Sequence, residues 1–442
     1  MAQLKTEKVI FYTSLPRLFR ATLIGYLYEI SQVYHVVLLS EELDEETKNI
    51  LSKKELFPGL EKVIQVRQYT DKRRVLSLGK NRYLKKAAKK IIKEENPDIV
   101  ILENDFYFFE MCLLRYACNA LKICFRPCFQ LGPKKEERLW SVLKNAHKMP
   151  AFMPFFIRKG LAELKKYLAH FLYYVILPLA VFERPFFGKS SCFLTADIAG
   201  LRQADYSTVL SQRDYDLVVT EGLPKERVHI LPHPLELESR KFLEKAYSFN
   251  KDSGYNKIIT FMYSDQGSGI RKEDNSFISS QEQQKTIIRI VSVLAKEFSD
   301  WAIFIKPHPV TNNFKELVDV FSLISSNIKV ARPSEPADKF IEKSSIIIGT
   351  SPSSNSLFTA SLQNPEKIIL SLDFDKELLG DSFKDFAGIE YIDNEEDFIK
   401  ILKDIKNNDY KKKSFLKNDS RFFKSSVELI EYVDNLRSSK TV

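Results

Sequence analysis

Two short polar segments in the second half of the chain follow apolar runs that are typical of buried strands. Lys306-Pro307-His308-Pro309 comes directly after Ala302–Ile305, and Ser351-Pro352-Ser353-Ser354-Asn355-Ser356 comes directly after Ile346–Ile348. The carboxyl ends of parallel strands bind ligands in open α/β sheets, and hydroxyls with free N–H groups at a helix start suit a phosphate. We therefore predict a phosphate cradle formed by His308, Ser353, Ser354 and Asn355.

The elements that must position this cradle follow from the alternation of short apolar runs with amphipathic stretches. Such alternation is typical of a parallel sheet that helices cover on both faces. It occurs twice, with a polar, aperiodic stretch near residues 245–255 between the two halves. We predict an α/β fold of two Rossmann-like lobes, with an N-terminal acceptor lobe over 1–245, a C-terminal nucleotide-binding lobe over 256–420, and a C-terminal helix and tail over 421–442.

The alternation breaks over residues 150–190, where aromatic and basic residues replace it. We predict a helical aromatic insertion in the first lobe. Apolar bulk combined with positive charge suits a helix at an anionic membrane surface, but it also suits a cap packed on the lobe or a contact between two copies. These three interpretations stay open. The residues concerned include Phe155, Phe156, Arg158, Lys159, Lys165, Lys166, Tyr173, Tyr174, Phe186 and Phe187.

The composition limits the classes of partner and cofactor that are expected for this protein. The 442 residues carry a formal net charge of +9, which favours anionic partners; no arginine-rich run with interleaved aromatics suggests nucleic acid. The five cysteines form no CxxC pair, so we expect reduced core thiols and no metal site. No G-x-G-x-x-G follows the first strand, and hence no dinucleotide cofactor is expected.

Neither a signal peptide nor a membrane span is expected from the sequence. The N-terminal residues have no apolar signal core, and the longest apolar run, Phe171–Phe182, is shorter than the roughly 20 residues that span a bilayer. We expect a cytoplasmic protein, with peripheral contact at the inner face of the cytoplasmic membrane as an open alternative.

Two Rossmann-like lobes with a terminal helix make the two-lobed glycosyltransferase architecture called GT-B. "IKPHPV" and "GTSPSSNSLFTA" resemble the HP and Ser/Thr-pair motifs of bacterial sialyltransferases and polysialyltransferases of capsule or lipopolysaccharide synthesis. The segment Val209–Pro234 is similar to the one that closes the first lobe in many GT-B enzymes. The resemblance implies an inverting, metal-independent glycosyltransferase with a nucleotide-sugar donor, CMP-sialic-acid-like or Kdo-like, and a glycan or glycolipid acceptor.

The resemblance also implies roles for single residues. His308 would bind the donor phosphate and help the nucleotide leave. Tyr263-Ser264-Asp265-Gln266-Gly267-Ser268 resembles the acidic pair followed by glycine of bacterial sialyltransferases, which makes Asp265 the candidate base and places Gly267 near the nucleotide. Glu103 and Asp105, just past an apolar strand, are alternative bases. Arg17 and Arg20, after the first strand, are candidates for holding an acceptor's carboxylate or phosphate.

Three other interpretations stay open. A CDP-glycerol-type glycerophosphotransferase carries a similar HP motif, although the aspartate that it tends to place beside its serine is missing here. A UDP-sugar 2-epimerase shares the two-lobed architecture, and a non-catalytic protein could bind nucleotide or glycan only. The segment Ser351–Ala360 contains no acidic residue, which disfavours the retaining GT-B branch.

Overall fold

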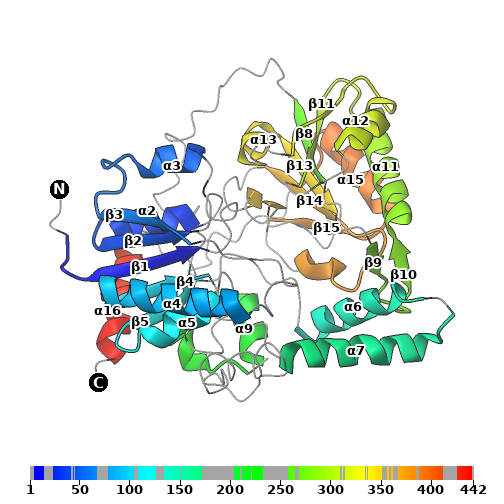
Figure 1. Ribbon diagram of the computed structural model, residues 1–442. Helices are drawn as coiled ribbons and strands as arrows, with labels where there is room; N and C mark the ends of the chain where they lie inside the picture. Colours follow the sequence, from blue (N-terminus) through cyan, green and yellow to red (C-terminus); the bar gives the residue numbers. More distant parts are fainter. Residues whose placement is uncertain are drawn as a thin grey trace. The chain divides into compact units, whose positions relative to one another are not determined.

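The computed structural model forms two compact units, which are described separately (Figure 1). Unit 1 comprises Met1–Gln130, Leu164–Ser248 and Ser420–Val442, and unit 2 comprises Leu131–Glu163 and Phe249–Asp419. The residues that the structure describes are 4–13, 23–40, 43, 45–66, 78–103, 108–125, 134–150, 152–171, 204–209, 212–220, 222–231, 257–263, 268–308, 311, 314–333, 335, 337–350, 356–357, 360–361, 367–384, 388–411 and 426–440.

Unit 1 is built on a seven-stranded sheet with the order β3-β2-β1-β4-β5-β6-β7, in which every pairing is parallel. Its central strands are apolar along their whole length because helices cover both faces of a parallel sheet. The strands are β1 (Lys8–Thr13), β2 (His35–Ser40), β3 (Leu60–Gln65), β4 (Ile99–Leu102), β5 (Leu121–Phe125), β6 (Tyr206–Val209) and β7 (Val228–Ile230).

The helices of unit 1 bury apolar faces against this sheet. One core joins α4 and α5 to β1, β2 and β4, with Ala88, Met111 and Leu113 fully buried. Gly222, two residues after the end of α9, has φ +103, a backbone conformation that suits glycine. The helices are α2 (Ile24–Ser31), α3 (Glu45–Leu51), α4 (Leu78–Glu95), α5 (Phe108–Tyr116), α9 (Gln212–Thr220), η4 (Lys225–Arg227) and α16 (Ser426–Lys440).

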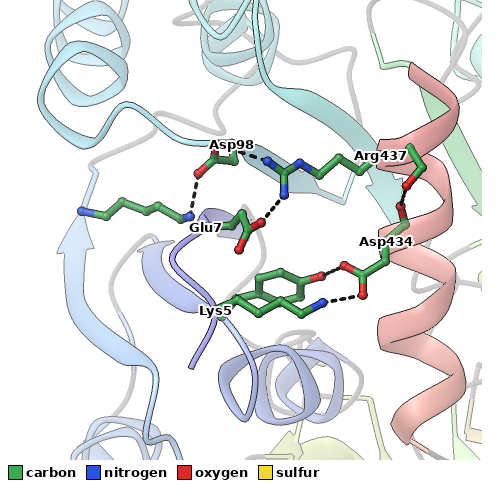
Figure 2. A network of polar contacts seen from close by, with 8 residues as sticks. Lys5, Glu7, Asp98, Asp434 and Arg437 are labelled. Carbon is green, nitrogen blue, oxygen red and sulfur yellow. Dashed lines mark hydrogen bonds and ion pairs between the residues drawn. The ribbon is translucent and has the colours of Figure 1, made fainter. Parts of the chain in front are cut away.

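The C-terminal helix α16 returns to unit 1, where it packs against α2 and β5. Leu429, Val433 and Leu436 are buried in this contact. Figure 2 shows the polar contacts beside it: Asp434 accepts a hydrogen bond of 2.5 Å from the Tyr34 hydroxyl and pairs with Lys5 at 2.5 Å, while Arg437 pairs with Glu7 and, at 3.9 Å, with Asp98.

Unit 2 is built on a six-stranded parallel sheet with the order β12-β11-β8-β13-β14-β15. A short antiparallel hairpin, β9 with β10, accompanies it. The strands are β8 (Ile258–Tyr263), β9 (Ser268–Ile270), β10 (Phe277–Ser279), β11 (Ala302–Pro307), β12 (Ile328–Val330), β13 (Ile346–Thr350), β14 (Ile368–Leu372) and β15 (Glu390–Ile392).

Helix α11 anchors the core of unit 2. It begins with a capping box, in which Ser279 and Glu282 exchange hydrogen bonds of 2.7 and 3.2 Å, and it buries Ile290 and Leu294 against the sheet. The helices of this unit are α6 (Lys134–His147), α7 (Phe155–Phe171, which continues into unit 1), α11 (Ser280–Glu297), α12 (Phe314–Ser322), α13 (Ala337–Lys343), η6 (Gly380–Phe383) and α15 (Glu395–Lys406).

The predicted α/β fold of two Rossmann-like lobes is confirmed. Two segments that were predicted to lie in the first lobe belong to unit 2: α6, which precedes the predicted insertion, and the first half of α7, which lies within it. The reason is apolar packing: Leu143 of α6 lies in one cluster with Ile270 of β9 and Leu378, and Ala162 of α7 packs on α6. Most of the remaining insertion, residues 172–190, lies outside the described residues. No helix among the described residues has the length and apolar composition to cross a bilayer.

Candidate functional site at the carboxyl edges of the sheets

The strand order of unit 2 reverses between β8 and β13. From β8 the chain proceeds outward to β11 and β12, then returns to the other side of β8 as β13 and continues to β14 and β15. Doubly wound sheets bind ligands outside the carboxyl ends of the strands at such a reversal. β8 ends at Tyr263 and β13 at Thr350. The segments that follow these two ends are therefore those in which a ligand is expected.

The sequence-predicted residues of this lobe follow the same strand ends. Asp265 and Gly267 come after β8, and the Ser353–Asn355 segment comes after β13, but all of them lie outside the described residues. His308 is described. It follows β11 and is exposed, its backbone N–H donates to the Tyr263 carbonyl at 2.9 Å, and its carbonyl accepts from the Thr311 N–H at 2.9 Å. These bonds hold His308 beside the end of β8.

Lys306, in the same motif, has a structural role that the sequence did not reveal. It is only 3% exposed. Its ammonium donates to the Pro307 carbonyl and, at 3.3 Å, to the Pro333 carbonyl, so it ties the end of β11 to the segment after β12. Burial lowers the pKa of Lys306 to about 8, and the nearby Glu335 carboxylate partly offsets this. The lysine thus fixes the backbone that presents His308.

Three carboxyl groups follow β14, which lies next to β13, and we call Asp373–Glu377 the acid loop. Asp373 accepts hydrogen bonds from the Tyr391 hydroxyl at 2.9 Å and from the Glu377 N–H at 3.0 Å. Asp375 accepts one from the Thr286 hydroxyl at 3.0 Å. These bonds come from the loop itself, from β15 and from α11, and they hold the carboxyl groups in fixed positions at the carboxyl edge of the sheet.

Glu377 is the most perturbed group of the acid loop. Its side chain is only 2% exposed; Oε1 accepts from the Gln283 amide, and Oε2 has no hydrogen-bond partner among the described residues. Burial raises the pKa of Glu377 to about 8, and the neighbouring carboxylates of Asp373 and Asp375 add to the shift. At neutral pH this group is mostly a neutral carboxylic acid, able to donate a hydrogen bond as well as to accept one.

A small pocket with both polar and apolar lining lies between the acid loop and α11. Gln283 and Thr286 of α11 line it together with Thr350 at the end of β13 and the three acids of the loop. About 20 Å³ of it is accessible to water, whereas one water molecule needs roughly 10–15 Å³. The pocket therefore has room for a water or one hydroxyl group, not for a whole nucleotide.

Two glycines allow the acid loop to pack so closely. A Cβ on Gly269 of β9 would lie 2.7 Å from the carboxyl carbon of Glu377, and a Cβ on Gly380 would overlap the Asp373 carboxylate. Both positions therefore require glycine. Sequence reasoning missed the acid loop; the available signal was an acid at every second position, D-x-D-x-E, directly after an apolar strand.

The sheet of unit 1 has the same kind of reversal, between β1 and β4. At the ends of these two strands the Thr13 hydroxyl donates a hydrogen bond to the Glu103 carboxylate, and both side chains are buried. Of the residues predicted for the first lobe, Glu103 is thus placed at the carboxyl edge. Asp105, Arg17 and Arg20 lie outside the described residues.

Comparison with known proteins identifies the fold. No family model and no curated protein matches the chain. Among solved structures, the UDP-GlcNAc 2-epimerase from Methanocaldococcus jannaschii gives a TM-score of 0.56 at 12% identity, covering 98% of this chain and 100% of that one. The S. aureus MnaA–UDP co-structure gives 0.53 at 14% identity, covering 98% of both chains. Anabaena Alr3699/HepE in complex with UDP and glucose gives 0.53 at 11% identity, covering 98% of this chain and 100% of that one. The chain has a GT-B-like fold.

Proposed function

We propose that this protein is an inverting, metal-independent glycosyltransferase that uses a nucleotide sugar to build a surface polysaccharide. The observation that carries the proposal is the position of His308 at the carboxyl edge of an all-parallel sheet, hydrogen-bonded through its backbone to the end of β8 at the strand-order reversal. Ligands bind at this place in doubly wound sheets. Imidazole beside a phosphate can donate a hydrogen bond when neutral, and a stronger one when protonated.

In this proposal the donor nucleotide occupies unit 2. His308 and the Ser353–Asn355 segment hold its phosphate, and Gly267 follows the strand that neighbours both. The pocket of the acid loop takes a single hydroxyl of the donor, because the carboxylates there accept hydrogen bonds and neutral Glu377 can donate one.

The proposed transfer is a single displacement. The acceptor hydroxyl oxygen attacks the anomeric carbon, the bond from that carbon to the phosphate oxygen breaks, and the nucleotide leaves with the electron pair. The acceptor's proton goes to a carboxylate base, for which Asp265 is the first candidate and Glu103 or Asp105 the alternatives. Charge on the leaving phosphate is stabilised by His308 and the serine hydroxyls. Arg17 and Arg20 would hold an anionic glycan or glycolipid acceptor.

The donor is proposed to be CMP-linked and sialic-acid-like or Kdo-like, from the resemblance of the HP and serine motifs. Two of the similar solved structures contain UDP, so uridine donors are the necessary comparison. Purified protein is incubated with CMP-sialic acid, CMP-Kdo and UDP-GlcNAc, each with a pool of glycan acceptors, and nucleotide release is measured with and without EDTA. We expect acceptor-dependent release of CMP that EDTA leaves unchanged.

The variant pair His308→Ala and His35→Ala assigns the chemistry to the site. His35 lies on β2 in unit 1 and pairs with Glu61 on the surface, so its loss leaves unit 2 intact. Release should fall sharply for His308→Ala only. Equal activity of both variants would remove His308 from the mechanism, and loss of transfer in EDTA with recovery in Mg²⁺ would refute metal independence.

A UDP-sugar 2-epimerase is the second candidate, favoured by the similarity to solved 2-epimerases over almost the whole chain. The two activities differ in their need for an acceptor. An epimerase converts UDP-GlcNAc alone to its 2-epimer, whereas a transferase releases nucleotide only when an acceptor hydroxyl is present. Epimer formation without acceptor, followed by NMR of the anomeric protons, would replace the transferase assignment.

A further inference from the structure

Helix α7 carries apolar side chains that are exposed among the residues that the structure describes. Phe156 is 74% exposed, Leu164 62% and Leu168 54%, and Phe152, just before the helix, is 86% exposed. Single exposed apolar residues are ordinary, but a contiguous set marks an interaction site. Apart from Phe155, whose ring packs on His147 of α6, the exposed apolar side chains of this segment, which we call the α7 face, are Phe152, Phe156, Ile157, Leu161, Leu164, Tyr167, Leu168 and Phe171.

The spacing of these residues places them on one side of α7. Ile157, Leu161, Leu164, Leu168 and Phe171 follow one another at intervals of four and three residues, which forms a stripe along a helix. Phe156 and Tyr167 extend the stripe on one flank. The side that packs is a different one, where Ala162 is buried against Val142 and Ala146 of α6. The most apolar side of the helix therefore faces away from the residues it packs on.

The charge around this face favours a lipid surface. Residues 134–171 contain nine basic and three acidic residues, a net charge of +6 out of +9 for the whole chain. A helix with one apolar face and a lysine-rich remainder lies in the plane of an anionic bilayer, with its apolar side chains among the headgroups and upper acyl chains. The length of α7, 17 residues, corresponds to about 25 Å of helix lying flat.

The same charges disfavour a second copy of the chain on this face. In an antiparallel pair of α7 helices, Arg158 and Lys165, which flank the stripe on one side, would oppose the same basic residues of the other copy. Like charges in that position destabilise a helix pair. The other flank carries Gly160, Glu163 and Tyr167. In an antiparallel pair each flank meets the same flank of the other copy, so Glu163 would not lie opposite Arg158 and Lys165.

We propose that the α7 face docks the protein on an anionic membrane by shallow insertion of its exposed aromatic and leucine side chains. The basic residues of α6 and α7 draw the protein to the surface, and the apolar stripe then provides the hold. This docking is independent of which reaction the protein catalyses. It gives a peripheral attachment that weakens as salt rises but does not vanish, because the apolar contribution is not screened.

The test is flotation of the full chain with vesicles of phosphatidylcholine alone or with phosphatidylglycerol added, at low and high salt. The variants are Leu164→Glu on the α7 face and Leu323→Glu after α12, where Leu323 is 87% exposed. Both exchange an exposed leucine for glutamate, so they change net charge equally. We expect the wild type and Leu323→Glu to float with anionic vesicles, and Leu164→Glu to bind at least about tenfold more weakly.

Phe156→Ser, at another exposed position, gives a second variant without a charge change, and the thermal unfolding of each variant checks that it is folded. The proposal is overturned if the wild type does not float with anionic vesicles at low salt, or if Leu164→Glu and Phe156→Ser float as well as the wild type. Light scattering that shows a wild-type dimer, dissociated by Leu164→Glu and without affinity for vesicles, would instead assign the face to a second copy.

Discussion

The buried carboxyl of Glu377 should make the stability of this protein depend on pH in a direction opposite to that of an ordinary paired carboxylate. Glu377→Gln is the perturbation of choice. Glutamine has nearly the same shape as the neutral acid and can still accept from Gln283, but it cannot ionise. The comparison therefore isolates the cost of keeping this one carboxyl protonated in the folded chain.

The magnitude follows from the two pKa values. In the unfolded chain Glu377 has its ordinary pKa near 4.5, and in the folded chain burial raises the pKa to about 8. Between these values the unfolded chain releases the proton and the folded chain retains it, so folding becomes less favourable as pH rises. Each pH unit in this window costs about 1.4 kcal/mol, which gives about 3 kcal/mol between pH 5 and pH 7. The glutamine variant does not lose this stability, because its side chain does not ionise.

Urea unfolding gives the free energy of unfolding of both proteins at about pH 5 and about pH 7. The change between the two pH values is then compared between the wild type and Glu377→Gln, because the contributions of the other carboxyl groups are the same in both proteins. Glu316→Gln, at an exposed position of α12, is the matched control and should follow the wild type. We expect Glu377→Gln to gain stability relative to the wild type as pH rises. An equal pH dependence in the wild type and Glu377→Gln would mean that Glu377 is ionised in the folded chain, and the account of the acid loop would be wrong.

Three further outcomes are expected. Gly269→Ala should destabilise the protein by about 1–3 kcal/mol in urea unfolding, because its Cβ would lie 2.7 Å from the Glu377 carboxyl carbon. The control is Gly160→Ala on α7, whose Cβ would meet nothing within 4 Å and which should be neutral or stabilising. Equal effects of the two substitutions on stability would contradict the close approach of Gly269 to Glu377. Arg437→Ala should cost about 0.5–1 kcal/mol of stability through the half-exposed pairs with Glu7 and Asp98, with the difference from the wild type shrinking in acid. This is because Arg437 lowers the pKa of Glu7, so the stability that this pair contributes is lost as pH falls and Glu7 becomes protonated. An unchanged urea midpoint of Arg437→Ala at neutral pH would show that α16 is held by its apolar residues alone. Ser353→Ala combined with Ser354→Ala should weaken nucleotide binding by roughly 1.5–3 kcal/mol for each lost bond to a charged group, measured by calorimetry, and unchanged affinity would leave the serines without a role.

The sequence predicted most of the sheet because buried parallel strands are apolar throughout. β1, β2, β4, β5, β8, β11 and β13 all follow this pattern. β3 was missed because it is an edge strand with mostly exposed side chains, Leu60-Glu61-Lys62-Val63-Ile64-Gln65. The three-residue strands β9, β10 and β15 were also missed, whereas β7 and β12, of the same length, were predicted. The packing of α6 on β9 depends on contacts between segments far apart in the sequence, and local periodicity cannot reveal such contacts.

The candidate site likewise has parts that a local sequence pattern predicts and parts that depend on long-range packing. The position of His308 at a strand end was predictable, because a proline-flanked histidine directly after an apolar run is a local signal. The acid loop was not, since a D-x-D-x-E segment reads as a solvated loop. Asp373 and Glu377 are buried because α11, β15 and Gly269, which has no side chain, lie against the loop. The perturbed pKa of Glu377 is thus a property of tertiary packing.

The central claim is that unit 2 binds the nucleotide of an activated sugar at the carboxyl edge of its sheet. Calorimetric titration of the purified full chain with CMP, CDP, UDP and GDP, repeated with His308→Ala, tests it most directly. The account predicts one-site binding of CMP, or of UDP for the uridine alternative, that His308→Ala weakens; at 100 times its Kd that nucleotide should also stabilise the protein by about 2.7 kcal/mol. Binding of none of the four, or binding that His308→Ala leaves unchanged, would contradict the claim.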